Sequence, residues 1–219
     1  MKQHFEAMKK AGLSLAFFAF ISVLFVAITD QLTHDKIIEN QRLFLLNALN
    51  QVVPANQYDN DLINSKMMLS AKKTGFQRDI PVYFATQKGK LVTAIFEQTT
   101  LQGYGGAIKL LIGINAGKPA SIAGVRVIQH SETPGLGDRM EIGKSNWVLS
   151  FNGKSIGHPP IPGWYVKKDG GDFDQFTGAT ITPRAIVNSV RSTLLYAQDN
   201  LQNIFKEHEK TKNTVEKHG

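Results

Sequence analysis

Three threonine hydroxyls lie close together in the segment FTGATITPR, residues 176–184, near the C-terminal end of the chain. Thr182 followed by Pro183 predicts the start of a helix, with Thr182 as the N-cap and proline at the first helical position. A helix N-terminus offers unpaired backbone N–H groups and the positive end of the macrodipole, so it suits an anion such as a phosphate. Thr180 would then lie beside that anion, with Thr177 as the other candidate hydroxyl.

Small residues surround these hydroxyls. Gly178 and Ala179 let another group approach the backbone closely, and Arg184 in the first helical turn would add a cation. The same residues also fit a tight turn with a cap and no ligand. The Gly-Lys-Ser/Thr sequence of a P-loop is absent here, so spacing alone does not decide between the two interpretations.

A second candidate site is the loop HSETPGLGD, residues 130–138, which follows an apolar strand. His130 and Glu132 alternate along an extended chain and would share a face, which would suit a metal pair, although no third ligand is near. Ser131, His130 and Asp174 would suit a hydrolase, but the chain has no Gly-x-Ser-x-Gly elbow. In a third segment, GYGGAIKL at residues 103–110, glycines surround Tyr104, either a ligand contact or a packed edge residue.

Strands and one long helix are expected to position these segments. Residues 81–97 predict two strands joined around Lys88-Gly89, and residues 107–115 and 122–130 predict a second pair that turns at AGKP. The run IKLLIGI is almost continuously apolar, which is typical of a strand covered on both faces. Residues 145–151 predict a short helix, and GWYVKK at 163–168 predicts a further strand.

A long C-terminal helix is predicted from Pro183, with a buried face at helical spacing. That face consists of Ile186, Val187, Val190, Leu194, Leu201, Ile204 and Phe205. Strands followed by helices without regular βαβ alternation indicate the α+β class: a mixed domain with antiparallel strand pairs and a long C-terminal helix.

The N-terminal part predicts a membrane anchor. Residues 12–29 carry no charge, and at roughly 1.5 Å per residue they reach about 27 Å, enough to cross a bilayer core. Lysines precede this run, so the positive-inside rule places the N-terminus in the cytoplasm and the rest of the chain on the far side. A cleaved signal peptide is the alternative, but the run is long and lacks an Ala-x-Ala site. Helical spacing from residue 35 to 53, stopped by Pro54, predicts a stalk helix.

Composition excludes several classes of protein. The chain has no cysteine, which excludes disulfides, thiolate iron–sulfur ligation and cysteine nucleophiles. The net charge of +7 is spread along the chain, without a basic block interleaved with aromatic residues, so we expect no nucleic-acid partner.

Taken together, these segments resemble the G subunit of the Rnf (Rsx) electron-transport complex. More distantly, the chain is similar to the C subunit of the sodium-translocating NADH:quinone reductase. The resemblance rests on GYGGAIKLLIG, HSETPGLGD, WYVKKDGGDFDQFTGATITPRAIVNSV, YDNDL and the single N-terminal span. The run from Asp174 to Thr180 matches the Asp-x-x-Ser/Thr-Gly-Ala-Thr acceptor signature of the periplasmic flavin transferase.

The resemblance implies that FMN is joined through its phosphate to Thr180, with Thr177 as the rival acceptor. A threonine hydroxyl needs activation by a neighbouring base, which a separate transferase that uses FAD and a metal would supply. The flavin ring is then expected against the loop from Glu132 to Gly137, where glycines permit close approach. The implied cofactor-binding residues are Glu132, Thr133, Pro134, Gly135, Leu136, Gly137, Lys168, Asp174, Thr177, Gly178, Ala179 and Tyr104, with Trp147 as a further neighbour.

The resemblance also implies how the chain is organised. Residues 1–11 would be a cytoplasmic N-terminus, 12–29 a transmembrane helix, 30–54 a stalk helix, 55–206 a periplasmic FMN-binding domain and 207–219 a charged flexible tail. The protein would be an electron-carrying subunit in the bacterial inner membrane, not a free-standing enzyme. Its partners would be membrane lipid, the transferase and the A, B, C, D and E types of Rnf subunit, which pass electrons between ferredoxin and NAD while moving Na⁺ or H⁺. The alternatives are the quinone-reductase subunit and an exported scaffold without a redox cofactor.

Overall fold

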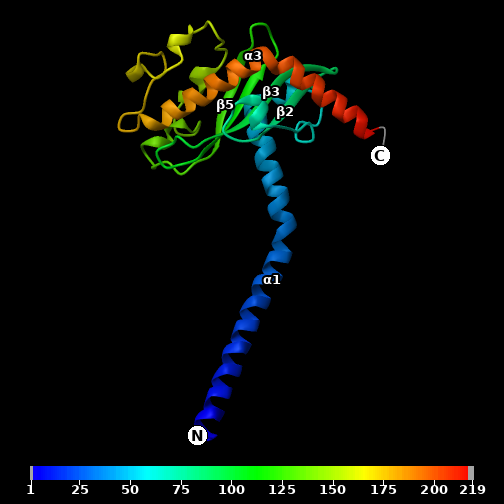
Figure 1. The fold of residues 1–219 in the computed structure, drawn as a ribbon, viewed down its shortest axis with the longest axis vertical. Helices are drawn as coiled ribbons and strands as arrows, with labels where there is room; N and C mark the ends of the chain where they lie inside the picture. The colour runs from blue at the N-terminus through cyan, green and yellow to red at the C-terminus, as the bar shows by residue number, and fades with distance from the viewer. Residues whose placement is uncertain (1, 217–219) are drawn as a thin grey trace. The chain divides into compact units, whose positions relative to one another are not determined.

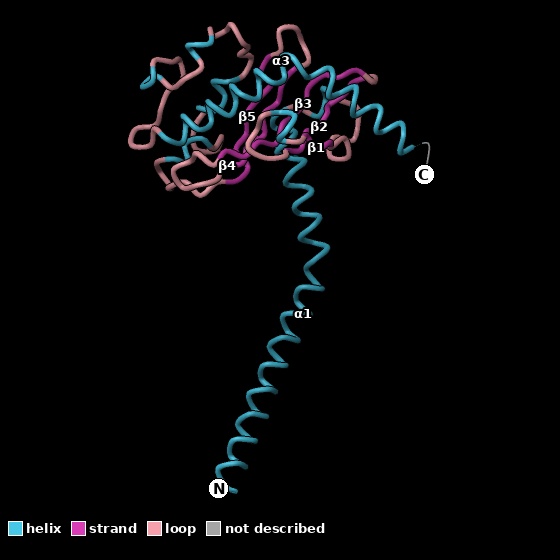
Figure 2. The backbone as a smooth tube through the Cα atoms, in the orientation of Figure 1, coloured by secondary structure: helices cyan, strands magenta, loops and turns pink. Residues whose placement is uncertain are grey.

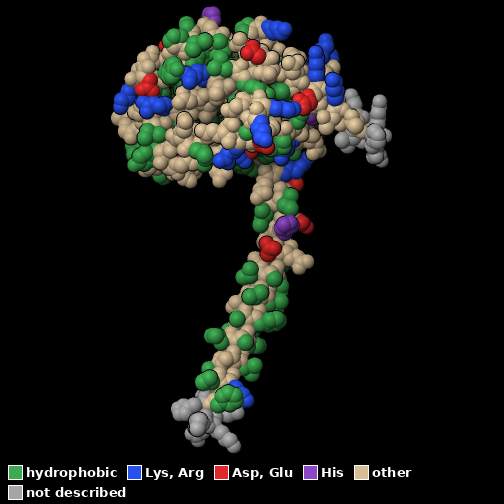
Figure 3. Space-filling model, viewed as in Figure 1, with side chains coloured by type: hydrophobic (Ala, Val, Ile, Leu, Met, Phe, Trp, Pro, Cys, Tyr) green, Lys and Arg blue, Asp and Glu red, His purple; other side chains and the backbone are tan. Residues whose placement is uncertain are grey.

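The computed structural model describes residues 2–216, and the chain divides into two compact units at Leu45/Leu46. In the first unit the described residues, 2–45, all belong to the helix α1, Lys2–Val52. It is long and apolar enough to cross a membrane, with a mean hydropathy of 2.5 in its most apolar window. Hydrophobic side chains cover much of α1 in Figure 3, and those of Leu13 and Val26 are 76% and 69% exposed. The predicted helix and its end before Pro54 are confirmed, and α1 continues without a break from the expected span into the expected stalk.

The second unit, from Leu46, is built on a five-stranded antiparallel sheet in the order β1-β2-β3-β4-β5. Its strands are β1 Met67–Leu69, β2 Ile80–Gln87, β3 Lys90–Thr100, β4 Ile108–Asn115 and β5 Ser121–Gln129. The predicted strand pairs are therefore confirmed, including the turn at Lys88-Gly89. The short edge strand β1 was not predicted. α3, Ile181–Glu216, lies across the strands in Figures 1 and 2, so the α+β class is confirmed.

Both faces of the sheet are covered, as the continuous apolar run in β4 predicted. Alternate residues of β4, such as Ile112 and Ile114, join the hydrophobic core beneath α3. On the opposite face Gly113 of β4 lies against Val52 at the end of α1. The predicted buried face of α3 is also confirmed, since its members join that core or pack against it; they are Ile186, Val187, Val190, Leu194, Leu201, Ile204 and Phe205.

Three local predictions were wrong. GWYVKK forms no strand: the segment contains the 3-10 turns η4 Ile161–Gly163 and η5 Lys167–Asp169, with one isolated bridge between Val166 and Phe173. α3 begins at Ile181, so Thr182 lies inside the first turn and is not the N-cap. The tail expected to be flexible from residue 207 is helical up to Glu216, and residues 217–219 lie outside the described part, as does Met1 of the expected cytoplasmic segment.

The remaining short helices join these elements. They are η1 Ala55–Gln57, α2 Ala71–Thr74, η2 Gly137–Met140 and η3 Trp147–Phe151. η3 confirms the short helix that residues 145–151 predicted. Its Trp147 ring packs edge-on against Phe151 and Phe176, at 5.3 Å and 5.0 Å between centroids, and so supports the segment that leads into α3.

Candidate functional site

The threonine-rich segment forms a tight turn that leads directly into α3. The Ala179 N–H donates to the Phe176 carbonyl at 3.0 Å, and Gly178 has a φ of 81°, which favours glycine. The Thr180 carbonyl accepts the first bond of the helix from the Arg184 N–H at 3.3 Å. Thr180 therefore occupies the N-cap position that the sequence assigned to Thr182.

The loop after β5 folds back on itself beside that turn. The Leu136 and Gly137 N–H groups both donate to the Thr133 carbonyl at 3.1 Å. Gly135 has a φ of 79°, a backbone conformation that favours glycine. The result places Thr133, Leu136 and Gly137 on one side of a hollow whose other side is the start of α3.

The hollow is a cavity of about 270 Å³ formed by three segments far apart in the sequence. It is lined by Tyr104, Glu132, Thr133, Leu136, Gly137, Gly178, Ala179, Thr180 and Ile181. Eight of these nine residues are among those that the resemblance implies for FMN attachment or binding, and Ile181 was missed. An apolar residue directly after Thr180 was the signal that would have found it, because the first turn of a surface helix normally carries polar groups.

Five of the predicted contacts do not line this cavity. They are Pro134, Gly135, Thr177, Lys168 and Asp174, and Trp147 is also outside it. The Asp174 carboxylate pairs with the Lys167 ammonium at 2.6 Å, and the Asp174 carbonyl accepts a bond from the Trp147 indole at 2.8 Å. The backbone N–H of Lys168 donates to the Gln175 side chain at 3.2 Å. These contacts brace the segment before the turn.

The cavity walls are mostly apolar and carry no cation among the lining residues. Tyr104, Leu136 and Ile181 are 73%, 43% and 44% exposed, a surface that a planar aromatic group would cover. Arg184, expected to help bind an anion, instead donates two hydrogen bonds to the Asp169 carboxylate, at 2.6 Å and 2.7 Å. Those bonds lower the pKa of Asp169 and raise the pKa of Arg184.

The structure gives His130 and Glu132 partners other than a metal or a nucleophile. The His130 Nδ1 accepts from the Glu132 backbone N–H at 3.0 Å, and its Nε2 lies 3.0 Å from the Glu141 carboxylate. The Glu132 carboxylate instead accepts bonds from the Gly105 N–H and the Thr182 hydroxyl. Asp174 pairs with Lys167, so the hydrolase arrangement with Ser131 and His130 is not assembled.

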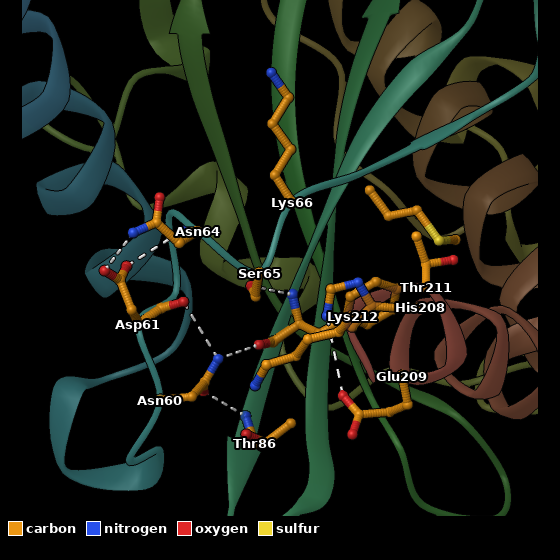
Figure 4. Close-up of a pocket in the computed structure, with 12 residues that line it drawn as sticks. Asn60, Asp61, Asn64, Ser65, Lys66, Thr86, His208, Glu209, Thr211 and Lys212 are labelled. Carbon is orange, nitrogen blue, oxygen red and sulfur yellow. Dashed lines mark hydrogen bonds and ion pairs between the residues drawn. The ribbon is translucent and has the colours of Figure 1, made fainter. Parts of the chain in front are cut away.

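A larger cavity of about 440 Å³ lies between the loop at residues 60–67 and the end of α3 (Figure 4). Its polar side chains form hydrogen bonds with the backbone of β2 beyond the residues that pair with β1. Asn60 bonds the Phe84 carbonyl at 2.9 Å and the Thr86 N–H at 2.8 Å, and the Ser65 hydroxyl accepts from the Phe84 N–H at 2.9 Å. The segment YDNDL, one of those that carry the resemblance, therefore contributes to pairing the sheet edge beyond the short strand β1.

Comparisons with known proteins agree with this geometry. Residues 103–195 match the FMN-binding domain family, and residues 1–52 match the family described as the RnfG N-terminal region. The first of these ranges contains every residue that lines the 270 Å³ cavity.

Curated relatives match almost end to end. The G subunit of the ion-translocating oxidoreductase complex of Vibrio atlanticus is 44% identical over 90% of this chain and 93% of its own length. The corresponding protein of Shewanella amazonensis is 46% identical over 87% and 88%. Among solved structures, the crystal structure of Shewanella oneidensis NqrC is similar with 21% identity and a TM-score of 0.44, covering 69% of this chain and 75% of that one. By its identity to these relatives over nearly its whole length, the chain belongs to the family of G subunits of ion-translocating oxidoreductase complexes, and it contains an FMN-binding domain.

Proposed function

We propose that this chain is an electron-carrying subunit of a membrane-bound, ion-translocating oxidoreductase complex, with FMN joined through its phosphate to the hydroxyl of Thr180. FMN, when bound, supplies the electron chemistry, and the protein supplies position and surroundings. The chain would be anchored by α1 in the bacterial inner membrane, with the N-terminus in the cytoplasm and the domain in the periplasm. Its partners would be the other subunits of the complex and, during maturation, a flavin transferase.

The observation that carries the attachment site is the different setting of the three hydroxyls. Thr177 is exposed and lies outside the cavity lining, whereas Thr182 is fully buried and donates its hydroxyl to Glu132. Only Thr180 of the three is both partly exposed and part of the cavity lining. Its place at the N-cap of α3 would leave unpaired backbone N–H groups for a phosphate, which matters because the lining includes no cation.

The remaining lining fits a flavin. The exposed apolar side chains of Tyr104, Leu136 and Ile181 would cover an aromatic ring, and the polar groups of Thr133 and Thr180 lie in the same cavity. The residues that would hold the ring are therefore those of the cavity, and Pro134, Gly135, Lys168 and Asp174 would support the loops around it.

Mass spectrometry of the full chain, co-expressed with a flavin transferase, tests the attachment. The tryptic peptide from Asp169 to Arg184 contains all three threonines, so fragment ions must localise the FMN. We expect FMN on Thr180, a colourless Thr180→Val protein and, as the matched control, a yellow Thr177→Ser protein, which keeps the Ser/Thr position of the acceptor signature. FMN that stays bound to denatured Thr180→Val protein would contradict the assignment.

A further inference from the structure

Glu132 carries a buried carboxylate, and each of its two oxygens accepts a hydrogen bond from the protein. The residue is only 5% exposed. Oε1 accepts the Gly105 N–H at 2.8 Å, and Oε2 accepts the hydroxyl of Thr182. One side chain thus joins the loop that carries Tyr104, the loop after β5 and the first turn of α3.

Glycines make room for this carboxylate. A Cβ placed on Gly103 would lie 2.7 Å from Glu132 Oε1, and one placed on Gly137 would lie 2.8 Å from Oε2. Either distance is shorter than an ordinary van der Waals contact, so side chains at these positions would displace Glu132. Gly103 and Gly137 therefore leave the space that the Glu132 carboxylate fills.

These contacts bear directly on Thr180. Thr182 is two residues further along the chain, in the first turn of α3, and among Thr177, Thr180 and Thr182 only its hydroxyl is seen to donate to a side chain of another segment. Fixing Thr182 to Glu132 fixes the start of α3 relative to the two loops that form the other cavity walls.

From this arrangement we propose that Glu132 is a positioning residue for flavin attachment, which acts through Thr182 to hold the Thr180 hydroxyl at the cavity. The inference rests on the proposed attachment of FMN to Thr180. In that transfer from FAD, the Thr180 oxygen bonds to the FMN phosphorus, the bond to the AMP phosphate breaks, AMP leaves and the threonine proton passes to a base. Glu132 has no assigned part in these bond changes, because the hydroxyl that its carboxylate accepts is that of Thr182 and not that of Thr180.

The first test measures the rate of flavin transfer from FAD by a purified flavin transferase to the purified full chain. Thr182→Val removes the hydroxyl that Glu132 holds, and we expect kcat to fall about 10- to 100-fold, as small misplacements of a reacting group do. KM for FAD should not change, since FAD binds the transferase. Thr182→Ser keeps a hydroxyl and should restore the rate to within about twofold of the wild type.

Thr193→Val is the matched control for lost stability. Thr193 is equally buried in α3, and its hydroxyl accepts a bond from Gln98 at 3.2 Å, away from the cavity lining. We expect this variant to lose thermal stability as Thr182→Val does, yet to accept flavin at the wild-type rate. Equal rates for Thr182→Val and the wild type, or equal losses in both valine variants, would overturn the proposal.

Glu132→Gln and Glu132→Ala separate positioning from proton transfer. A glutamine keeps both contacts, since its oxygen accepts the Gly105 N–H and its amide donates to Thr182, so the rate should stay within about threefold of the wild type. Alanine loses both contacts and should match Thr182→Val. If Glu132→Gln is as slow as Glu132→Ala, the carboxylate acts as a base and the positioning role is wrong. Wild-type protein that gains no FMN on Thr180 would instead contradict the attachment itself.

Discussion

His208 shows how burial of a single titratable residue makes stability depend on pH. Its ring lies on Phe84 of β2, at 4.7 Å between ring centroids, and its side chain is 12% exposed. Burial lowers the pKa of His208 below the ordinary value of 6.5; Glu209 opposes this effect and Lys212 adds to it. At pH values well above 6.5, His208 is neutral in both the folded and the unfolded chain. As the pH falls below that value, the unfolded chain binds the proton first, so the free energy of unfolding decreases.

His208→Phe should remove this part of the pH dependence while it keeps a ring on Phe84. We expect wild-type protein to lose more stability than His208→Phe between about pH 7.5 and about pH 5, since only the wild type has the buried His208 ring, which the unfolded chain protonates in that range. Denaturant unfolding of both proteins at the two pH values measures the difference. Parallel losses in the two proteins would show that His208 does not contribute.

Also at the scale of single residues, the sequence led to Thr180 as the expected attachment site for FMN, but it gave no sign of the positioning role proposed for Glu132. The small residues around Thr180 are adjacent in the chain, so its setting was visible locally, and the resemblance selected it from three hydroxyls. The contacts of Glu132 join Gly105, Gly137 and Thr182, which are brought together only by the folded sheet and helix. Gly137 was expected only to give a ligand access, because spacing does not reveal what else a glycine makes room for.

Among the elements, the end of α1 packs against two glycines of the sheet. Gly113 of β4 and Gly124 of β5 are directly paired, and both face Val52. A Cβ on Gly113 would overlap the Val52 Cγ1 atom. The Arg126 guanidinium completes the contact by donating to the Gln51 carbonyl at 2.9 Å, one of the carbonyls left unpaired at a helix C-terminus.

Gly113→Ala should therefore destabilise the domain by about 1–3 kcal/mol, the usual effect of overpacking. Val52→Ala alone should also destabilise it, through a cavity. Combined, the two changes should cost less than their sum, because the smaller residue 52 makes room for the new methyl group. Denaturant unfolding of the wild type, the two single variants and the double variant gives the interaction free energy. Strict additivity would contradict direct packing of Val52 against Gly113.

The elements themselves were predicted with uneven success for a physical reason. β2 to β5 show the alternating or continuous apolar patterns of strands joined by short turns, so local pattern was sufficient. GWYVKK has a similar strand-like composition, but it forms no strand. Gly171 packs against the backbone of Tyr165, and the segment from 161 to 173 folds into turns. β1 was missed because three residues are too few to show a period.

For the whole molecule, the boundary between the two compact units lies within α1, between Leu45 and Leu46, and not at the end of that helix. Leu49, Val52 and Val53 are each at most 3% exposed and belong to the second unit, whereas the residues up to Leu45 form the first. A chain that begins at Leu46 should therefore keep the complete core of the domain. A chain that begins at Pro54 loses these three side chains, each worth about 1.5–3 kcal/mol when buried, and exposes apolar surface of β4 and β5.

Comparison of these two truncated chains with the full protein tests that boundary. The chain from Leu46 should leave the membrane fraction, unfold at the same denaturant concentration as the domain in the full protein and still carry FMN on Thr180 after exposure to FAD and a flavin transferase. The chain from Pro54 should unfold at a lower concentration or aggregate, because the apolar residues on that face of the sheet lose their cover. Equal stability of both truncated chains would mean that the last two turns of α1 serve only the anchor, and the paired glycines would then need another explanation.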